Sequence, residues 1–250
     1  MSLGKTLLVT GGSRGIGAEV VRMAAARGWR VAFSYVSNKA AADTLVREVE
    51  EAAGEAFALQ ADVGSEADIV RSFEAVDSRF GRLDGLVNNA GVVDAKARVE
   101  EISLARLERM MRINVIGSML CAREAVKRMS TKNGGNGGAI VNLSSVAARL
   151  GSPGEYVDYA ASKGAIDTFT VGLAREVVEE GIRVNAVRPG LIDTEIHASG
   201  GQPDRLQRIR GQIPMKREGK AVEIAAAVVW LLSEEASYCT GALLDVSGGR

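Results

Sequence analysis

Cysteine is scarce in this sequence. The only two cysteines in 250 residues, Cys121 and Cys239, lie far apart and form no Cys-x-x-Cys pair. A disulfide scaffold and a cysteine-based zinc site are therefore excluded, because both need several cysteines at close spacing. We expect both cysteines to be small buried hydrophobic residues in a reducing compartment, and we expect no bound metal.

Long hydrophobic runs and an excess of one charge are also absent. No stretch of about 18 apolar residues could span a membrane, and the first residues lack the pattern of a signal peptide. Thirty-one basic and 31 acidic residues cancel, which removes any general attraction to nucleic acid or to an anionic membrane. We therefore expect a cytoplasmic protein that binds neither nucleic acid nor membrane.

Aromatic residues make up only 4% of the chain, whereas hydrophobic residues as a whole make up 46%. The core must therefore consist mainly of Ala, Val, Leu and Ile. A chain of 250 residues is long enough for one α/β domain with a large buried core, and short for two independent ones.

Short apolar runs alternate with longer segments of helical period. The runs read as strands at residues 7–9, 30–35, 56–60, 86–88, 140–143, 183–187 and 243–246. The helical segments are residues 15–27, 39–53, 66–80, 104–129, 156–179 and 221–232. This alternation predicts a doubly wound (Rossmann) α/β fold, a parallel sheet of about seven strands with helices on both faces. No linker interrupts it, so residues 1–250 are predicted to form a single domain.

Two segments break the alternation. Residues 133–138 are rich in Gly and Asn, which predicts a mobile surface connection. Residues 191–219 are longer than an ordinary connection and contain a Gly-Gly pair and two prolines, which is typical of a substrate-binding lid loop. The single histidine, His197, falls in this loop, where a solvated side chain is a better interpretation than a substrate contact.

A glycine cluster, Gly11-Gly12-Ser13-Arg14-Gly15-Ile16-Gly17, joins the first predicted strand to the first predicted helix. Glycines there allow a tight turn and a close approach to a pyrophosphate, whose charge the N–H groups at the helix N-terminus can bind. The cluster alone is weak, but its place in the alternating chain makes it a strong signal for a dinucleotide. We assign cofactor contacts to Gly11, Ser13, Arg14, Gly15, Ile16 and Gly17.

The charge after the second predicted strand indicates which dinucleotide binds. An NAD site usually has an acidic residue about 20 positions past the glycine turn, where it bonds the ribose hydroxyls. Residues 31–39 contain no Asp or Glu and offer Ser37, Asn38 and Lys39 instead, while Arg14 projects from the turn. Because cations and neutral donors hold a 2′-phosphate and a carboxylate repels it, these residues predict NADP(H) rather than NAD(H).

Tyr159 and Lys163 lie four residues apart near the start of a predicted helix, so they share one helix face. A nearby cation lowers the pKa of a tyrosine from its usual value of about 10. The phenol can then act as a general acid for a carbonyl or a general base for an alcohol. Ser144-Ser145 ends a strand just upstream, where a serine hydroxyl could bond the substrate oxygen; spacing alone does not separate the two serines.

These motifs and their order resemble those of the short-chain dehydrogenase/reductase family over essentially the whole chain. The glycine turn is similar to the nucleotide fingerprint of the family's shorter branch. Ser145 matches the catalytic serine, with one extra residue before Tyr159, and Asn114 looks like the helix asparagine that joins a water relay to the lysine. The resemblance adds cofactor contacts at Asp62, Val63, Asn89, Ala90, Gly91, Pro189, Gly190, Ile192 and Thr194.

The resemblance implies hydride transfer between NADP(H) and a small-molecule carbonyl or secondary alcohol. Tyr159 would be the general acid or base, Ser145 would polarise the substrate oxygen, and Lys163 would lower the tyrosine pKa and hold the nicotinamide ribose. Asn114 would carry the proton relay outward through water.

Other functions and the assembly remain open at this stage. A 3-oxoacyl carrier-protein reductase fits the motifs, although the acidic pair Glu179-Glu180 would repel an acidic carrier protein. A sugar, alcohol or ketone substrate fits at least as well, and the family also contains glucose 1-dehydrogenase-like members. A non-catalytic NADP-sensing protein is disfavoured because the Ser, Tyr and Lys residues are all present. The family resemblance also implies a homotetramer or homodimer, assembled through Trp230-Leu-Leu and residues 241–249.

Overall fold

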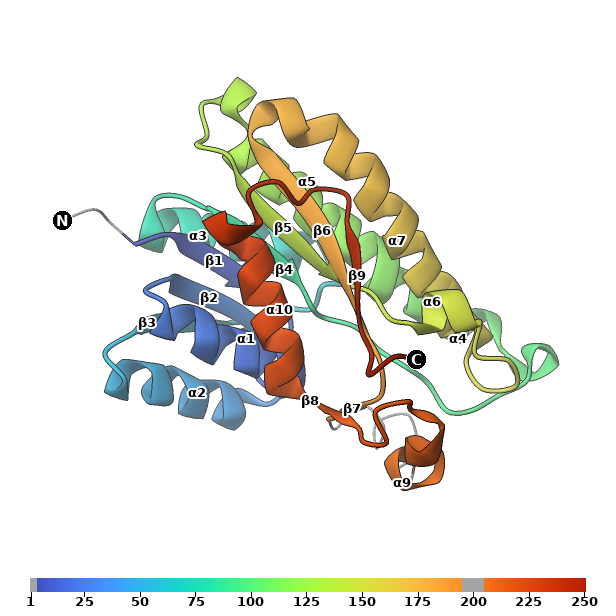
Figure 1. The fold of residues 1–250 in the computed structure, drawn as a ribbon. Helices are drawn as coiled ribbons and strands as arrows, with labels where there is room; N and C mark the ends of the chain where they lie inside the picture. The colour runs from blue at the N-terminus through green and yellow to red at the C-terminus, as the bar shows by residue number, and fades with distance from the viewer. Residues whose placement is uncertain (1–3, 195–204) are drawn as a thin grey trace.

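The computed structural model describes residues 4–194 and 205–250. Its main element is a seven-stranded parallel sheet in the order β3-β2-β1-β4-β5-β6-β9 (Figure 1). The strands are β1 (Thr6–Val9), β2 (Arg30–Tyr35), β3 (Glu55–Gln60), β4 (Gly85–Asn88), β5 (Gly138–Leu143), β6 (Ile182–Pro189) and β9 (Leu243–Val246). Every run predicted as a strand lies in one of them, so the predicted fold class is confirmed.

Helices cover both faces of this sheet because its strands carry apolar side chains on both sides. In β1, Leu7 belongs to one core cluster and its neighbour Leu8 to the other, and both are almost fully buried. Successive residues of a strand point to opposite faces, so such a run needs cover on both. One face carries α1 (Gly15–Ala26), α2 (Lys39–Glu51) and α10 (Ala221–Leu232); the other carries α3 (Glu66–Phe80), α5 (Ser118–Met129) and α7 (Val157–Val177) (Figure 1).

The strand order determines where a ligand can bind. The chain builds outward from β1 to β2 and β3, returns to β4 beside β1, and then builds outward in the other direction through β5 and β6 to β9. The connections diverge between β1 and β4, which leaves a crevice beyond the carboxyl ends of these strands. The predicted motifs follow the strands on that edge, so the topology gathers them there.

Residues 104–129 are helical throughout, as predicted, but they do not form one uniform α-helix. The chain forms α4 (Leu104–Met111), a π-helical segment over Arg112–Gly117, and then α5. Asn114 lies in this segment, and its side chain donates to the carbonyl of Val92 at 2.9 Å and accepts from the Val92 N–H at 2.8 Å. Hydrophobic periodicity did not reveal the wider turn, because the helices on either side keep their own repeat.

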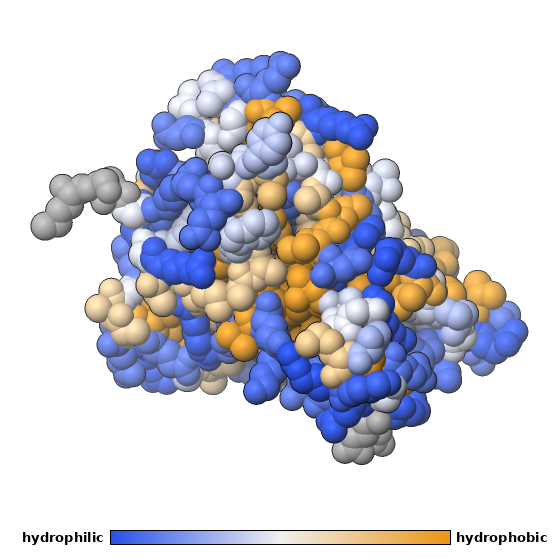
Figure 2. Space-filling model, viewed as in Figure 1, coloured by the Kyte–Doolittle hydropathy of each residue, from blue (hydrophilic) through white to orange (hydrophobic). Residues whose placement is uncertain are grey.

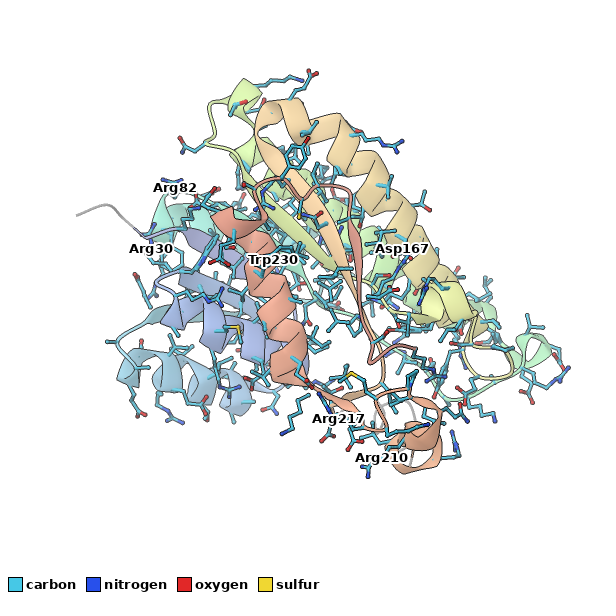
Figure 3. The ribbon with its side chains drawn as sticks, in the orientation of Figure 1. Arg30, Arg82, Asp167, Arg210, Arg217 and Trp230 are labelled. Atoms are coloured by element: carbon cyan, nitrogen blue, oxygen red, sulfur yellow. The ribbon has the colours of Figure 1, made fainter. Side chains whose placement is uncertain are left out.

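The segment predicted as a lid contains regular structure. A short parallel ladder joins β7 (Ile192–Asp193) to β8 (Gly219–Lys220), and α9 (Arg205–Ile209) lies between them in the sequence. Arg210 pairs with Glu218 and Arg217 pairs with Glu223, each at 2.6 Å, and Figure 3 shows both arginines in this segment below α10. His197 lies outside the described residues. The role of residues 191–219 as a lid stays a prediction.

Residues 133–138, predicted as a mobile connection, are held by backbone hydrogen bonds. Gly135 donates to Ser130 at 2.9 Å, and Gly137 donates to Met129 at 2.7 Å. A Cβ at Gly135 would lie 2.4 Å from a backbone carbonyl oxygen of α5. The glycines therefore serve close packing here as well as backbone freedom.

The two cysteines differ in their surroundings. Cys121 is buried, and burial together with nearby Glu124 raises the pKa of its thiol to about 12. Cys239 is only partly buried, so the expectation of burial holds in full for one of the two. Of the helices that the structure describes, none is both long and apolar enough to cross a bilayer.

Candidate active site

A cavity of about 740 Å³ lies beyond the carboxyl ends of the central strands. Its wall comes from the segments that follow β1 to β6 and from the start of α7. Most of the site residues predicted from the sequence line it: Gly11, Ser13, Arg14, Gly15, Ile16, Ser37, Asn38, Asp62, Val63, Asn89, Ala90, Gly91, Ser145, Tyr159, Lys163, Pro189, Gly190, Ile192 and Thr194. Gly17, Lys39 and Asn114 are not part of the wall.

The glycine turn forms a cradle at the N-terminus of α1. Gly11 has a φ of +64°, a conformation that glycine adopts without strain. Gly17 lies behind the wall, where a Cβ would be 2.4 Å from the carbonyl oxygen of Gly11. No acidic residue lies in the first turn of α1, so the N–H groups and the helix dipole favour an anion there. The arrangement fits a pyrophosphate.

Asn89, predicted from the sequence, and two residues that were not predicted, Thr10 and Ser34, hold this turn against β4 and β2. Thr10 Oγ1 accepts hydrogen bonds from the backbone N–H groups of Asn89 and Ala90, both at 3.0 Å. Asn89 Nδ2 in turn donates to the carbonyl oxygens of Thr10 and Gly11, at 2.9 and 2.8 Å. On the other side, Ser34 Oγ accepts from the Gly11 N–H at 3.0 Å. In the sequence, only their positions near strand ends could have indicated that Thr10 and Ser34 hold the turn.

The predicted phosphate-selecting residues do not all face the cavity. Ser37, Asn38 and Arg14 line it, and Asn38 Oδ1 also caps α2 by accepting from the Ala41 N–H at 3.0 Å. Lys39 points elsewhere, and its ammonium pairs with Asp43 at 2.7 Å on the exposed surface of α2. Tyr35 and Val36 also line this part of the cavity and were not predicted. Of the two cations predicted to select the phosphate, only Arg14 therefore lines the cavity.

Tyr159 and Lys163 both line the cavity from the first turns of α7. The Lys163 ammonium lies 5.7 Å from the centre of the Tyr159 ring and donates to the carbonyl of Leu143 at 2.7 Å. Burial lowers the pKa of Lys163 to about 8, while nearby Asp167 acts in the opposite direction. A cation so close to the ring favours the phenolate form of Tyr159.

The two serines after β5 have different bonds. Ser144 Oγ donates to the carbonyl of Lys163 at 3.2 Å, which fixes the start of α7 against β5. Ser145 Oγ accepts from the Ala147 N–H at 3.1 Å, so its own proton can still be donated to a ligand. This difference favours Ser145 as the residue that bonds a substrate oxygen.

Asn114 lies behind the wall rather than in it. Its side chain is 1% exposed and donates to Ser162 Oγ at 3.1 Å as well as to Val92. A Cβ placed on Gly91 would lie 3.4 Å from Asn114 Oδ1 and 3.6 Å from Lys163 Nζ. Gly91 therefore lies beside both side chains, and its lack of a Cβ leaves the space next to them open. The predicted water relay through Asn114 stays a prediction.

The segment after β6 closes the other side of the cavity. Pro189, Gly190, Ile192 and Thr194 all line it, and the Gly190 N–H donates to the carbonyl of Val246 at 3.1 Å. A Cβ on Gly190 would lie 2.7 Å from the Cα of Ser247. The last strand thereby fixes this segment over the region that Tyr159 and Lys163 face.

Known proteins are similar in sequence to this chain along nearly its whole length. Residues 11–250 match a family model described as enoyl-(acyl carrier protein) reductase. The chain is 56% identical to the uncharacterized oxidoreductase YgfF of Escherichia coli, over 97% of this chain and 98% of the relative. It is 39% identical to glucose 1-dehydrogenase 2 of Bacillus subtilis, over 98% of this chain and 94% of the relative.

A solved structure shows the same fold with a cofactor bound. The short-chain dehydrogenase of Burkholderia cenocepacia in complex with NADP superposes with a TM-score of 0.90 and 32% identity. The match covers 98% of this chain and 97% of the other. The fold, the family model and the relatives agree: the chain belongs to the short-chain dehydrogenase/reductase family and is an NAD(P)-dependent oxidoreductase.

Proposed function

We propose that this protein interconverts a carbonyl and a secondary alcohol with NADP(H) as cofactor and Tyr159 as the general acid or base. The observation that carries the proposal is the Lys163 ammonium, buried 5.7 Å from the centre of the Tyr159 ring in a cavity that also contains the glycine cradle. A phenol beside a buried cation can exchange a proton near neutral pH, which an isolated tyrosine does poorly.

Each residue of the site has its own role in the proposed reaction. A nicotinamide bound in the cavity supplies or takes up the hydride. Tyr159 gives a proton to the substrate oxygen in reduction and removes it in oxidation. Ser145 donates a hydrogen bond to the same oxygen and stabilises charge that develops there. Lys163 keeps the tyrosine acidic, and the N–H groups of the cradle bind the pyrophosphate.

The preference for NADP(H) is supported by charge. Arg14 lines the cavity beside Ser37 and Asn38, and no acidic residue occurs from 31 to 39. Asp62, the acidic residue in the wall, follows β3 rather than β2. The Burkholderia cenocepacia relative is described with NADP bound.

Two substrate classes are candidates: a sugar or ketone is the first, and a 3-oxoacyl thioester is the second. The first is supported by the likeness to glucose 1-dehydrogenase 2. The acidic pair Glu179-Glu180 does not weigh against the second, because it precedes the amino end of β6, at the edge of the sheet opposite the cavity. Glu180 is also paired with Lys132 at 2.8 Å.

The test is NADPH oxidation with a panel of ketones, aldoses and 3-oxoacyl thioesters. We expect turnover with at least one class, and loss of at least about a thousandfold for Tyr159→Phe, with NADPH affinity nearly unchanged, because only the proton donor is removed. Full turnover by Tyr159→Phe would show that another group supplies the proton.

A further inference from the structure

An arginine–aspartate pair lies directly beside Tyr159. Arg106 of α4 donates from Nε and Nη2 to the two carboxylate oxygens of Asp158, at 2.7 and 3.0 Å. The Asp158 side chain is 2% exposed and that of Arg106 is 11% exposed. Two parallel bonds fix the orientation of both groups, and loss of either partner would leave the other buried without compensation.

Asp158 also lies in the first turn of the helix that carries Tyr159, directly before the tyrosine. Backbone N–H groups there have no partner within the helix, so a carboxylate is favourable at this end of α7. Burial alone would raise the pKa of Asp158, but the bonds from Arg106 and the backbone N–H groups at the start of α7 hold it below its ordinary value. The ionised carboxylate therefore ties the first turn of α7, which bears Tyr159, to Arg106 of α4.

The same arginine is also bonded to the segment that follows β4. Arg106 Nη1 donates to the carbonyl of Ala95 at 2.6 Å. Ala95 follows Val92 and Val93, which line the cavity, and the Ala97 N–H donates to the carbonyl of Glu155 just before α7. One guanidinium thus joins α4, the wall segment 92–97 and the start of α7.

We propose that Arg106 is a positioning residue for this active site. Through Asp158 and Ala95 it holds the start of α7, which bears Tyr159, and residues 92–97 at a fixed separation, so that the phenol stays within reach of a substrate oxygen. Arg106 itself is not part of the cavity wall. This inference rests on the proposed function, in which Tyr159 transfers the proton.

The test compares Arg106→Ala, Arg106→Lys and Arg106→Ala/Asp158→Asn with the wild type. We expect Arg106→Ala to lower kcat about 10- to 100-fold, the cost of a small displacement of a reacting group, while the Kd for NADPH measured by fluorescence stays within about twofold of wild type. Arg106→Lys restores part of the loss, since one ammonium cannot make both bonds of the fork. The double variant loses about as much as Arg106→Ala, because both changes break one unit.

Arg128→Ala is the matched control. The Arg128 side chain is 18% exposed and pairs at 3.0 Å with the buried carboxylate of Glu124 on α5, away from the cavity. Its loss should lower Tm and leave kcat unchanged. The proposal is overturned if Arg106→Ala, or Arg106→Lys where the alanine variant does not fold, lowers Tm as Arg128→Ala does but keeps kcat.

An equal fall in kcat and NADPH affinity would also overturn it. Tyr159→Phe is assayed in parallel. An active Tyr159→Phe refutes the proposed function, whereas an inactive Tyr159→Phe with a fully active Arg106→Ala refutes only the positioning role.

Discussion

Lys163 is a buried cation whose proton is held less tightly in the folded chain than in water. Burial lowers its pKa to about 8 from 10.5, against the opposing effect of Asp167. Figure 3 shows Asp167 on α7, and it pairs with Arg188 at 2.8 Å, so part of its charge is already neutralised. The active site therefore keeps a charged Lys163 at a cost in stability, which is typical of functional sites.

The cost should appear as a pH dependence of stability. Between pH 8 and 10.5 the unfolded chain binds the Lys163 proton and the folded chain has lost it, so the free energy of unfolding rises with pH over this range. Relative to Lys163→Met, the wild type should gain up to about 3 kcal/mol between pH 7 and pH 10.5. Urea unfolding of both proteins at several pH values measures this, and a constant difference between them would contradict it.

Arg14 is the residue on which cofactor choice is expected to turn. Hydrogen bonds to a charged group contribute about 1.5–3 kcal/mol, so Arg14→Ala should lower kcat/KM for NADPH about 10- to 100-fold and leave that for NADH nearly unchanged. Lys39→Ala is the matched control, since the Lys39 ammonium pairs with Asp43 outside the cavity wall. If Lys39→Ala impairs NADPH use and Arg14→Ala does not, the assignment of the phosphate site is wrong.

At the scale of the elements, the junction of β1 and α1 depends on close packing. The phosphate cradle exists only because the chain turns sharply after Thr10 and α1 begins against the turn. Gly17 permits this contact, with a Cβ position 2.4 Å from a backbone oxygen. Backbone cannot move aside as a flexible side chain can, so this glycine is required by packing.

Gly17→Ala and Gly172→Ala should therefore have opposite effects. Gly17→Ala should destabilise the fold by about 1–3 kcal/mol through overpacking. A Cβ at Gly172, inside α7, meets nothing within 4 Å, so Gly172→Ala should stabilise by about 0.5–1 kcal/mol through lower backbone entropy. Thermal and urea unfolding distinguish them. Equal effects of the two changes would refute this explanation.

For the whole molecule, one face carries a group of partly exposed hydrophobic residues. Figure 2 shows hydrophobic residues gathered where α10 and β9 lie, and Figure 3 places Trp230 on α10 at this face. The expected interface needs one correction: Leu231 and Leu232 are buried in the core, and only Trp230 of the three is partly exposed. In β9, the last strand of the sheet, Leu243 and Leu244 are also only partly buried.

We predict a homodimer or homotetramer that uses this face. Burial of Trp230 and of the apolar residues of β9 between copies would stabilise the assembly. Light scattering after size exclusion should give two or four times 26.3 kDa, and Trp230→Arg should shift the protein toward smaller species. A wild-type mass near 26.3 kDa would contradict the prediction.

The sequence alone determined the fold class and most of the cavity wall. Short apolar runs dictate a covered parallel sheet, and a parallel sheet brings the segments after its strands to one edge, where Gly11, Ser145 and Tyr159 line one cavity. The apolar runs and the motifs that follow them are local in the sequence, so they can be recognised without knowledge of any tertiary contact.

The tertiary structure decided what depends on a partner far along the chain. Asn114, which lies in a π segment, bonds Val92, 22 residues earlier in the chain. The acidic pair Glu179-Glu180 no longer argues against a carrier-protein substrate, because it lies before β6, at the edge of the sheet opposite the cavity. Arg106 is fixed by Asp158, 52 residues away. Hydrophobic periodicity does not predict such a pair. Spacing can reveal which residues share a face, but which of them meet is set by packing.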